Sequence, residues 1–361
     1  MSSQRSRSRT QGSVKRARQA RRRRGLAAAL ILAILAIVLV ALIGGGGGGA
    51  SPKQGAQQSS RAAPRSTAAT PVRVRVGVAQ TGTLPTAEQD AAAVVVAPGS
   101  FLLLGGIDQA ETSLADIVSA GATNAHKIGS LPTALHDASA SFLKGAAYLF
   151  GGGVVSSYAQ ITRVAPDGAN QPAGVLPTPA SDVASATMGD TVYIVGGYTG
   201  ATPLRTILAW QPGRQAHVVG LLPRPLRYAA LAAVGGQLII AGGTSGESAT
   251  RGIYRFDPAT GRLASIGLLP RPLTHAAATS LNGTVFVFGG RGSSATSQTR
   301  QILAIASTGG VETVGLLPTA LSDLAAVSTA GHIVIAGGRD ASGRVHDEIL
   351  TASVTPRPAH P

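Results

Sequence analysis

Apolar segments, turn residues and paired glycines recur along this chain at a nearly constant spacing. Six Leu-Pro pairs begin at Leu84, Leu131, Leu176, Leu222, Leu269 and Leu317. Each is followed by a diglycine, and these begin at Gly105, Gly151, Gly196, Gly242, Gly289 and Gly337. Successive diglycines are 46, 45, 46, 47 and 48 residues apart. A regular period in this range predicts a solenoid, a propeller or an array of repeats.

Within one period, four short apolar segments are separated by turns. In the fourth copy these segments are 228–234, 237–241, 252–256 and 262–267. Their lengths and their branched residues predict β-strands, and Gly-Gly and the sequence DPATG provide the turns between them. Because the period holds four strands and no helical pattern, it predicts one blade of a β-propeller. Six diglycines predict an all-β fold of six blades.

The two ends of the repeat complement each other. After the sixth diglycine only one more strand is available, at 347–353, so the last blade lacks a fourth strand. The alternating segment VRVRVGVAQTG, at 72–82, precedes the first Leu-Pro pair and has no blade of its own. We therefore expect this N-terminal strand to complete the last blade, so that residues 72–355 close into a ring without a free sheet edge.

In three features, residues 72 to 354 resemble the kelch family. Diglycines end the second strand of each blade, as in GGQLIIAGG and NGTVFVFGG, and the period suits a kelch blade. The stretch IYRFDPATGRLASIGLLPRPLTHAA is similar to the aromatic, turn and Pro-Arg part of a kelch repeat. The chain departs from that pattern in its single tryptophan, Trp210, which falls on a third strand where kelch blades usually carry a Trp on the fourth. The resemblance implies the fold more directly than it implies a site.

Ahead of the repeat, three segments of very different composition predict a membrane anchor. Residues 1–24 hold ten Lys or Arg and no acid, and residues 25–43 are uncharged and apolar. A helix over 25–43 would span roughly 28 Å, which is close to the thickness of a bilayer core. Residues 44–71 are rich in Gly, Ala, Ser and Gln and predict a flexible linker.

The basic flank predicts that residues 1–24 stay in the cytoplasm while the propeller lies outside the cell, tethered by one helix in the cell membrane. A cleaved signal peptide and a twin-arginine export signal remain alternative interpretations of this region. We attribute the basic run at 1–24 to membrane topology and not to nucleic-acid binding. At the other end, residues 356–361 are predicted to form a short C-terminal tail.

Charge and cysteine content narrow the chemistry of the folded part. The net charge is +15, but all sixteen acids lie beyond residue 72, where eighteen basic residues nearly balance them. The absence of cysteine excludes disulfides, thiol catalysis, cysteine-ligated zinc and any thioether-linked cofactor. We predict no cofactor, no metal and no catalytic residue that can be assigned from the sequence.

One position of the repeat carries polar groups all around the predicted ring. Six residues after each Leu of the Leu-Pro pairs stand Asp90, Asp137, Asp182, Tyr228, His275 and Asp323. At the start of the innermost strands these residues would surround the mouth of the central channel, where clustered carboxylates raise one another's pKa or attract a hard cation. The alternative is structural, with each Asp accepting a hydrogen bond from a Leu-Pro loop and fixing its turn.

Arginines break the symmetry of the repeat in blades four to six. They are Arg224, Arg227, Arg271, Arg291 and Arg339. If the Leu-Pro segments and the loops after the diglycines lie on one face, these side chains could bind a carboxylate or a phosphate there. The alternative is that they are ordinary surface arginines.

Three functions follow as hypotheses. The favoured one is a membrane-tethered extracellular binding module whose partner is a protein, a glycan or a small anion. The second is an enzyme: the resemblance implies that some kelch-like propellers act on sugars, for example as sialic-acid mutarotases, so a carbohydrate isomerase is the alternative. The resemblance to copper-radical oxidases of this fold fails because the chain has no cysteine. The third is a structural domain of an envelope assembly.

Overall fold

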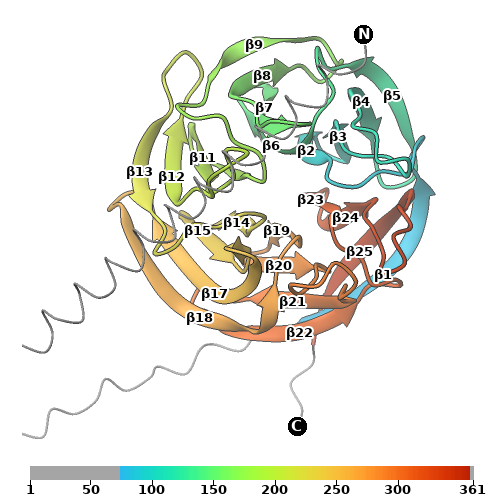
Figure 1. The fold of residues 1–361 in the computed structure, drawn as a ribbon. Coiled ribbons are helices and arrows are strands. Elements are labelled where there is room, and N and C mark those ends of the chain that lie inside the picture. Colours follow the sequence, from blue (N-terminus) through green and yellow to red (C-terminus); the bar gives the residue numbers. More distant parts are fainter. Residues whose placement is uncertain (1–73, 358–361) are drawn as a thin grey trace, which may run out of the picture. The chain divides into compact units, whose positions relative to one another are not determined.

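The computed structural model describes residues 74–357, which form β-strands joined by loops (Figure 1). Within this range no helix is long and apolar enough to cross a membrane. The predicted basic tail, membrane helix and linker at 1–71, and the end of the C-terminal tail from 358, lie outside the described residues.

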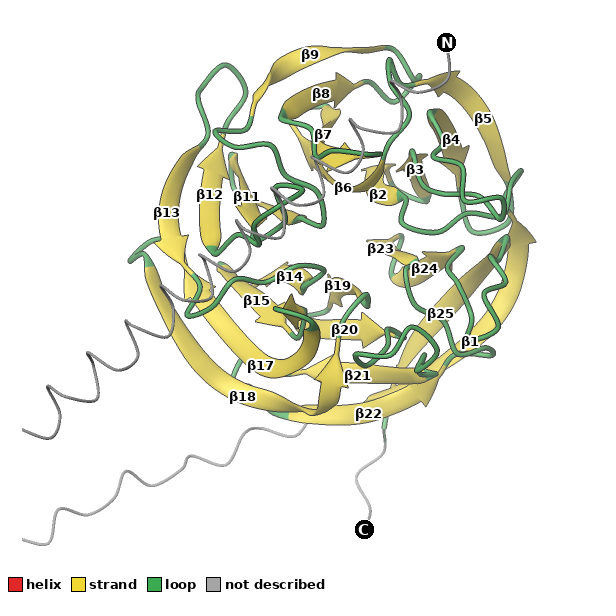
Figure 2. Cartoon of the chain, viewed as in Figure 1, coloured by secondary structure: helices red, strands yellow, loops and turns green. Residues whose placement is uncertain are grey.

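The strands form six antiparallel sheets arranged as the blades of a propeller (Figure 2). Blade one consists of β2 (Ala92–Ala97), β3 (Ser100–Leu104), β4 (Asp116–Ala120) and β5 (Ala125–Ser130). Blade two consists of β6 (His136–Leu143), β7 (Ala146–Gly153), β8 (Gln160–Val164) and β9 (Asn170–Val175). Blade three consists of β10 (Ala184–Met188), β11 (Thr191–Val195), β12 (Thr206–Trp210) and β13 (His217–Leu221). Blade four consists of β14 (Ala230–Val234), β15 (Gln237–Ala241), β17 (Ser248–Asp257) and β18 (Arg262–Leu273), with the small β16 (Thr244–Ser245) beside β17. Blade five consists of β19 (Ala277–Leu281), β20 (Thr284–Phe288), β21 (Gln301–Ile305) and β22 (Val311–Leu316). Blade six is β23 (Ala325–Thr329), β24 (His332–Ala336), β25 (Glu348–Pro356) and β1 (Val74–Thr83).

The sixth blade confirms the predicted closure of the ring. The N-terminal strand β1 pairs antiparallel with β25, the last strand of the chain, with Val76 opposite Val354. In Figure 1 the first and the last coloured strands accordingly lie side by side. The six blades and their four strands each are as the period predicts, although β14 begins two residues later than expected and β18 continues through the Leu-Pro pair.

The core is divided among the seams between blades. Six clusters of buried apolar side chains occupy the described residues, and each one joins two neighbouring blades. The cluster between blades two and three contains Trp210, which packs edge-on against Tyr148 and Phe150 at 4.8 and 5.3 Å between ring centroids. A tryptophan on the third strand thus fills the seam with blade two.

The recurring Leu-Pro pairs and diglycines have complementary roles at these seams. The leucine of all six Leu-Pro pairs is buried, which anchors the segment that leads into each innermost strand. The first glycine of each diglycine has a positive φ and packs against the Leu-Pro segment of the next blade. At Gly151, for example, φ is 61° and a Cβ atom would overlap the carbonyl oxygen of Ala180. Only glycine satisfies both the backbone conformation and this close approach.

Candidate functional site

The six equivalent polar residues surround the channel, and five backbone hydrogen bonds link them to one another. All six have φ between 52° and 60°, a left-handed conformation in which Asp is among the more tolerated residues. The amide of Asp137 donates to the carbonyl of Asp90, that of Asp182 to Asp137, and that of Tyr228 to Asp182. The amides of Asp90 and Asp323 donate in the same way to the carbonyls of Asp323 and His275. Part of the reason for the repeated Asp is therefore the backbone.

The ring residues line two cavities along the channel. A cavity of about 200 Å³ is bounded by the six ring residues and by the small residues that follow them, which are mostly alanine. A mouth cavity of about 370 Å³ is lined by five of the ring residues together with Gln89, Glu111, Gln298, Arg291 and Arg339. The mouth thus combines residues of the Leu-Pro segments with residues of the loops after the diglycines.

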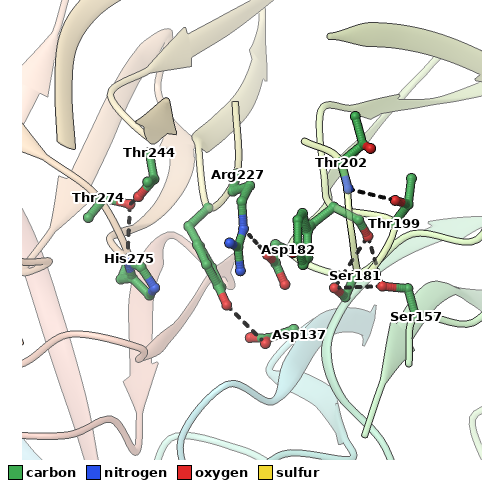
Figure 3. Close-up of polar contacts among 12 residues, drawn as sticks. Asp137, Ser157, Ser181, Asp182, Thr199, Thr202, Arg227, Thr244, Thr274 and His275 are labelled. Carbon is green, nitrogen blue, oxygen red and sulfur yellow. Dashed lines mark hydrogen bonds and ion pairs between the residues drawn. The ribbon is translucent and has the colours of Figure 1, made fainter. Parts of the chain in front are cut away.

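On one side of the ring, the side chain of Arg227 is bound to Asp182. Its Nε donates to the Asp182 carboxylate, as Figure 3 shows, and its guanidinium lies 4.0 Å from the centroid of the Tyr198 ring. The Asp182 side chain is only 2% exposed. Partial burial acts to lower the pKa of Arg227, but the attraction of Asp182 outweighs it and the pKa is raised. This arginine neutralises a buried acid.

Tyr228 and His275 are stacked next to this pair, with 3.7 Å between ring centroids. The Tyr228 hydroxyl donates to Oδ2 of Asp137 at 3.1 Å. Nε2 of His275 lies 3.0 Å from a guanidinium nitrogen of Arg291, and Nδ1 lies 3.0 Å from the hydroxyl of Thr274. Because Arg offers only donors, Nε2 is the acceptor and Nδ1 carries the proton. Burial and the charges of Arg291 and Arg227 lower the pKa of His275 to about 3, so the imidazole is neutral at pH 7.

Asp90 lies between Asp137 and Asp323 in the ring, and the charges of both neighbours act on it. Burial, followed by the charges of these two neighbours, raises the pKa of Asp90 well above its usual range. Burial and Asp182 likewise raise the pKa of Asp137. Burial also raises the pKa of Asp323, but its hydrogen bond from Ser322, at 2.5 Å, and the charges of Arg291 and Arg339 act in the opposite direction. This arrangement favours a proton held between carboxyl groups on this side of the ring.

Arg291 and Arg339 follow the diglycines of blades five and six and both line the mouth cavity. Within residues 74–357, neither guanidinium lies within ion-pair distance of a carboxylate. Arg291 bonds to the neutral His275, and Nε of Arg339 is buried without a hydrogen-bond partner in the described structure. The mouth therefore carries two positive charges that no neighbouring acid neutralises through direct contact.

The remaining predicted residues lie elsewhere. Arg224 and Arg271 are exposed and line neither the channel nor the mouth cavity. Arg271 instead lines a separate cavity on blade five. In the described range, no three His, Asp or Glu side chains are arranged to hold a metal ion.

Several polar residues near the site were missed by the sequence analysis. Gln89 and His136 stand one residue before ring positions, and Tyr198 directly follows a diglycine. Gln89 lines the mouth, the ring of His136 accepts from or donates to Ser113 at 2.9 Å, and Tyr198 lies under Arg227. These residues occupy repeat positions next to those of the ring residues and the diglycines, and this equivalence is the signal that could have revealed them.

Comparisons with known proteins agree with this architecture. The family model of the Kelch motif matches residues 179–215 and 225–262, which fall on blades three and four. The solved structure described as "Structure of YjhT" superposes with a TM-score of 0.66, covering 76% of this chain and 99% of that chain at 12% sequence identity, and this likeness concerns the fold alone. No curated protein sequence matches the chain at a significant level. The motif matches, the solved structure and the six four-stranded blades together identify the protein as a kelch-like β-propeller.

Proposed function

We propose that the propeller is a binding module that takes an anionic group of its ligand into the mouth of the central channel. One observation carries this proposal: Arg291 and Arg339 line a cavity of about 370 Å³ and, among the described residues, contact no carboxylate. A guanidinium in a concave, partly buried site is suited to bind a carboxylate or a phosphate through two parallel hydrogen bonds.

The rest of the mouth supports an anion in preference to a cation. His275 is neutral, and the raised pKa values of Asp90 and Asp137 favour their protonated form, in which a carboxyl group donates a hydrogen bond. The Asp182 carboxyl group is paired with Arg227. Arg291 and Arg339 are therefore the cationic groups of the mouth, which the carboxyl groups of Asp323 and Glu111 also line.

The setting of the module is proposed from the sequence of residues 1–71. The basic tail, the apolar segment and the linker support a propeller held outside the cell by a single membrane helix, within reach of a protein or glycan partner. An acidic group on such a partner is the part that we assign to the mouth.

The second candidate function is a carbohydrate isomerase at the same place. It is favoured by the concentration of groups with shifted pKa values, since acid-base catalysis needs one group that gives a proton and another that takes one. Asp90 is suited to give a proton, and Asp323, which accepts from Ser322, is suited to take one. Turnover of sugars or sugar acids, followed by NMR exchange between anomers, tests this candidate; its absence over a broad panel would exclude it.

The binding function is tested by ligand-induced stabilisation of the full-length protein in detergent. A ligand that binds only the folded state raises the melting temperature. We expect stabilisation by carboxylates, phosphate or sugar acids but not by neutral sugars, and loss of this stabilisation in Arg291→Ala and Arg339→Ala. Arg224→Ala is the matched control, because it removes an exposed arginine outside the mouth. Equal responses in all three variants, or no response to any anion, would contradict the proposal.

A further inference from the structure

A second cavity, separate in chemistry from the mouth, lies on blade five. It has a volume of about 380 Å³ and is formed between the Leu-Pro segment that enters β19 and the loop that joins β20 to β21. Its apolar wall includes Pro270, Pro272, Leu273 and Leu303. Polar side chains of the loop complete the lining, and Gln298 is shared with the mouth cavity.

One end of this cavity carries a positive charge. Arg271 belongs to the lining, is exposed and forms no ion pair with any residue in the described range. The loop adds the hydroxyl groups of Ser293, Ser297 and Thr299. Thr299 accepts a hydrogen bond from the amide of Gln301 at 3.2 Å, which leaves its own hydroxyl proton available as a donor. An apolar pocket with a cation at its rim matches a molecule with an aliphatic part and an acidic head.

The repeat provides an internal reference for this cavity. The equivalent place in blade two is lined by Pro132, Thr133, Leu135, Tyr158 and Gln160 and holds only about 170 Å³. Thr133 stands where blade five has Arg271, since both follow the proline of a Leu-Pro pair. Tyr158 stands where blade five has Thr299, two residues before the glutamine that begins the third strand.

Relative to blade two, Thr to Arg and Tyr to Thr provide the charge and the space together. Blade four has the same residue types at these two places, Arg224 and Thr250, so what points to a ligand in blade five is the cavity itself, with its apolar wall and the exposed Arg271. We infer that the blade-five cavity binds a small aliphatic carboxylate, with its chain against Leu273 and Leu303 and its carboxylate on Arg271. This site is independent of the anion site that we propose at the mouth.

The test is a ligand-observed NMR titration of the full-length protein with straight-chain carboxylates from acetate to hexanoate. Burial of each methylene contributes about 0.8 kcal/mol, so the affinity should rise about fourfold per carbon until the cavity is full. Pentanamide, which has a similar chain but no charge, should bind at least tenfold more weakly than pentanoate. A flat response to chain length, or equal binding of the amide, would overturn the proposal.

Two variants locate the site. Arg271→Ala should weaken pentanoate binding at least tenfold, whereas Arg224→Ala should not change it. The two arginines occupy the same position of the identical segments GLLPRPL at 220–226 and 267–273, so this is a matched pair. Thr299→Tyr copies the residue of blade two and should fill the cavity, abolishing the dependence on chain length. If Arg271→Ala binds pentanoate like the wild type, the assignment is wrong.

The mouth variants separate this proposal from the proposed function. Arg291→Ala and Arg339→Ala should leave the chain-length series unchanged, because neither residue lines the blade-five cavity. If the series disappears in these variants and persists in Arg271→Ala, carboxylates bind only at the mouth. That result would overturn the blade-five site and leave the proposed function in place.

Discussion

The two sides of the channel mouth use the same side chain in opposite ways. On the side of blades three and four, Arg227 is bound to the buried Asp182 and lies over the Tyr198 ring. On the side of blades five and six, Arg291 meets the neutral His275, and Arg339 has no ion-pair partner among the described residues. The difference arises from the residue that faces each guanidinium. A buried acid paired with Arg227 gives this arginine a structural role, whereas the neutral His275 leaves the charge of Arg291 available to a ligand.

The largest loss of stability is expected from removal of Arg227. Arg227→Ala would leave the nearly inaccessible carboxylate of Asp182 without its partner. Removal of one member of a buried ion pair destabilises a protein by about 3 to 5 kcal/mol, and we expect the lower end of this range because Arg227 is itself 27% exposed. Equilibrium urea unfolding measures the change. The double variant Arg227→Ala/Asp182→Asn should recover part of the loss, and a single variant as stable as the wild type would contradict the comparison.

The second prediction concerns Glu88, whose backbone carbonyl accepts a hydrogen bond from Gly338, next to Arg339. Glu88 is 4% exposed and occupies a place that is filled by Ala180 in blade three and by Leu in the four other blades. Burial, and then the charge of Asp116, raises its pKa from 4.5 to about 8. The acid is therefore mostly neutral at pH 7.

The raised pKa of Glu88 has a direct consequence for stability. The folded state holds a proton that the unfolded state releases, so the stabilising effect of this proton is complete below pH 4.5 and is lost as the pH rises to about 8. At pH 7 the loss amounts to roughly 3 kcal/mol. In Glu88→Gln this pH dependence should be absent, so its stability relative to wild type should increase from pH 4.5 to 8. If the free energies of unfolding of the two proteins, measured in urea, change in parallel over this pH range, Glu88 does not have the raised pKa assigned to it.

Much of the fold could be predicted from the sequence because its determinants repeat. The Leu-Pro leucines, the diglycines and the unpaired strand at the N-terminus are local signals, and six copies make each one reliable. The pairing of β1 with β25 could be predicted because the last blade lacked a fourth strand and the N-terminal strand had no blade of its own. The ring of polar residues could be predicted in the same way, since equivalent positions must lie at equivalent places.

The roles of individual side chains could not be predicted in this way. Arg224, Arg227 and Arg339 look alike in the sequence, yet the structure places one on the surface, one in an ion pair and one in the mouth. These differences depend on contacts between blades, which no local pattern encodes. The blade-five cavity could not be predicted either, because it forms between a Leu-Pro segment and a loop after a diglycine, which are separated in the sequence.

A moderate effect is expected from Tyr228→Phe, which tests the boundary between the two sides. The variant keeps the ring stacked on His275 and removes only the hydroxyl that donates to Asp137. A lost hydrogen bond of this kind costs about 1 to 2 kcal/mol, since Asp137 remains buried without its donor. Urea unfolding again measures the change. If the variant is less stable than Arg227→Ala, the hydroxyl, and not the ion pair, is the main support of this side.

The smallest change in stability is expected on the side of blades five and six. Arg291→Ala and Arg339→Ala remove charges that neutralise no directly contacting acid, so Arg339→Ala should change the free energy of unfolding by about 0.5 kcal/mol or less. Arg291→Ala also leaves Nε2 of the buried His275 without its donor, so this variant should cost about 1 kcal/mol instead. The two arginine charges also lower the pKa of Asp323, and the double variant should therefore raise that pKa, which carboxyl-selective NMR can follow through a pH titration. A large loss of stability in either single variant would mean that Arg291 or Arg339 supports the fold to the same extent as Arg227. The mouth would then offer no free cation from this pair, and the contrast between its two sides would disappear.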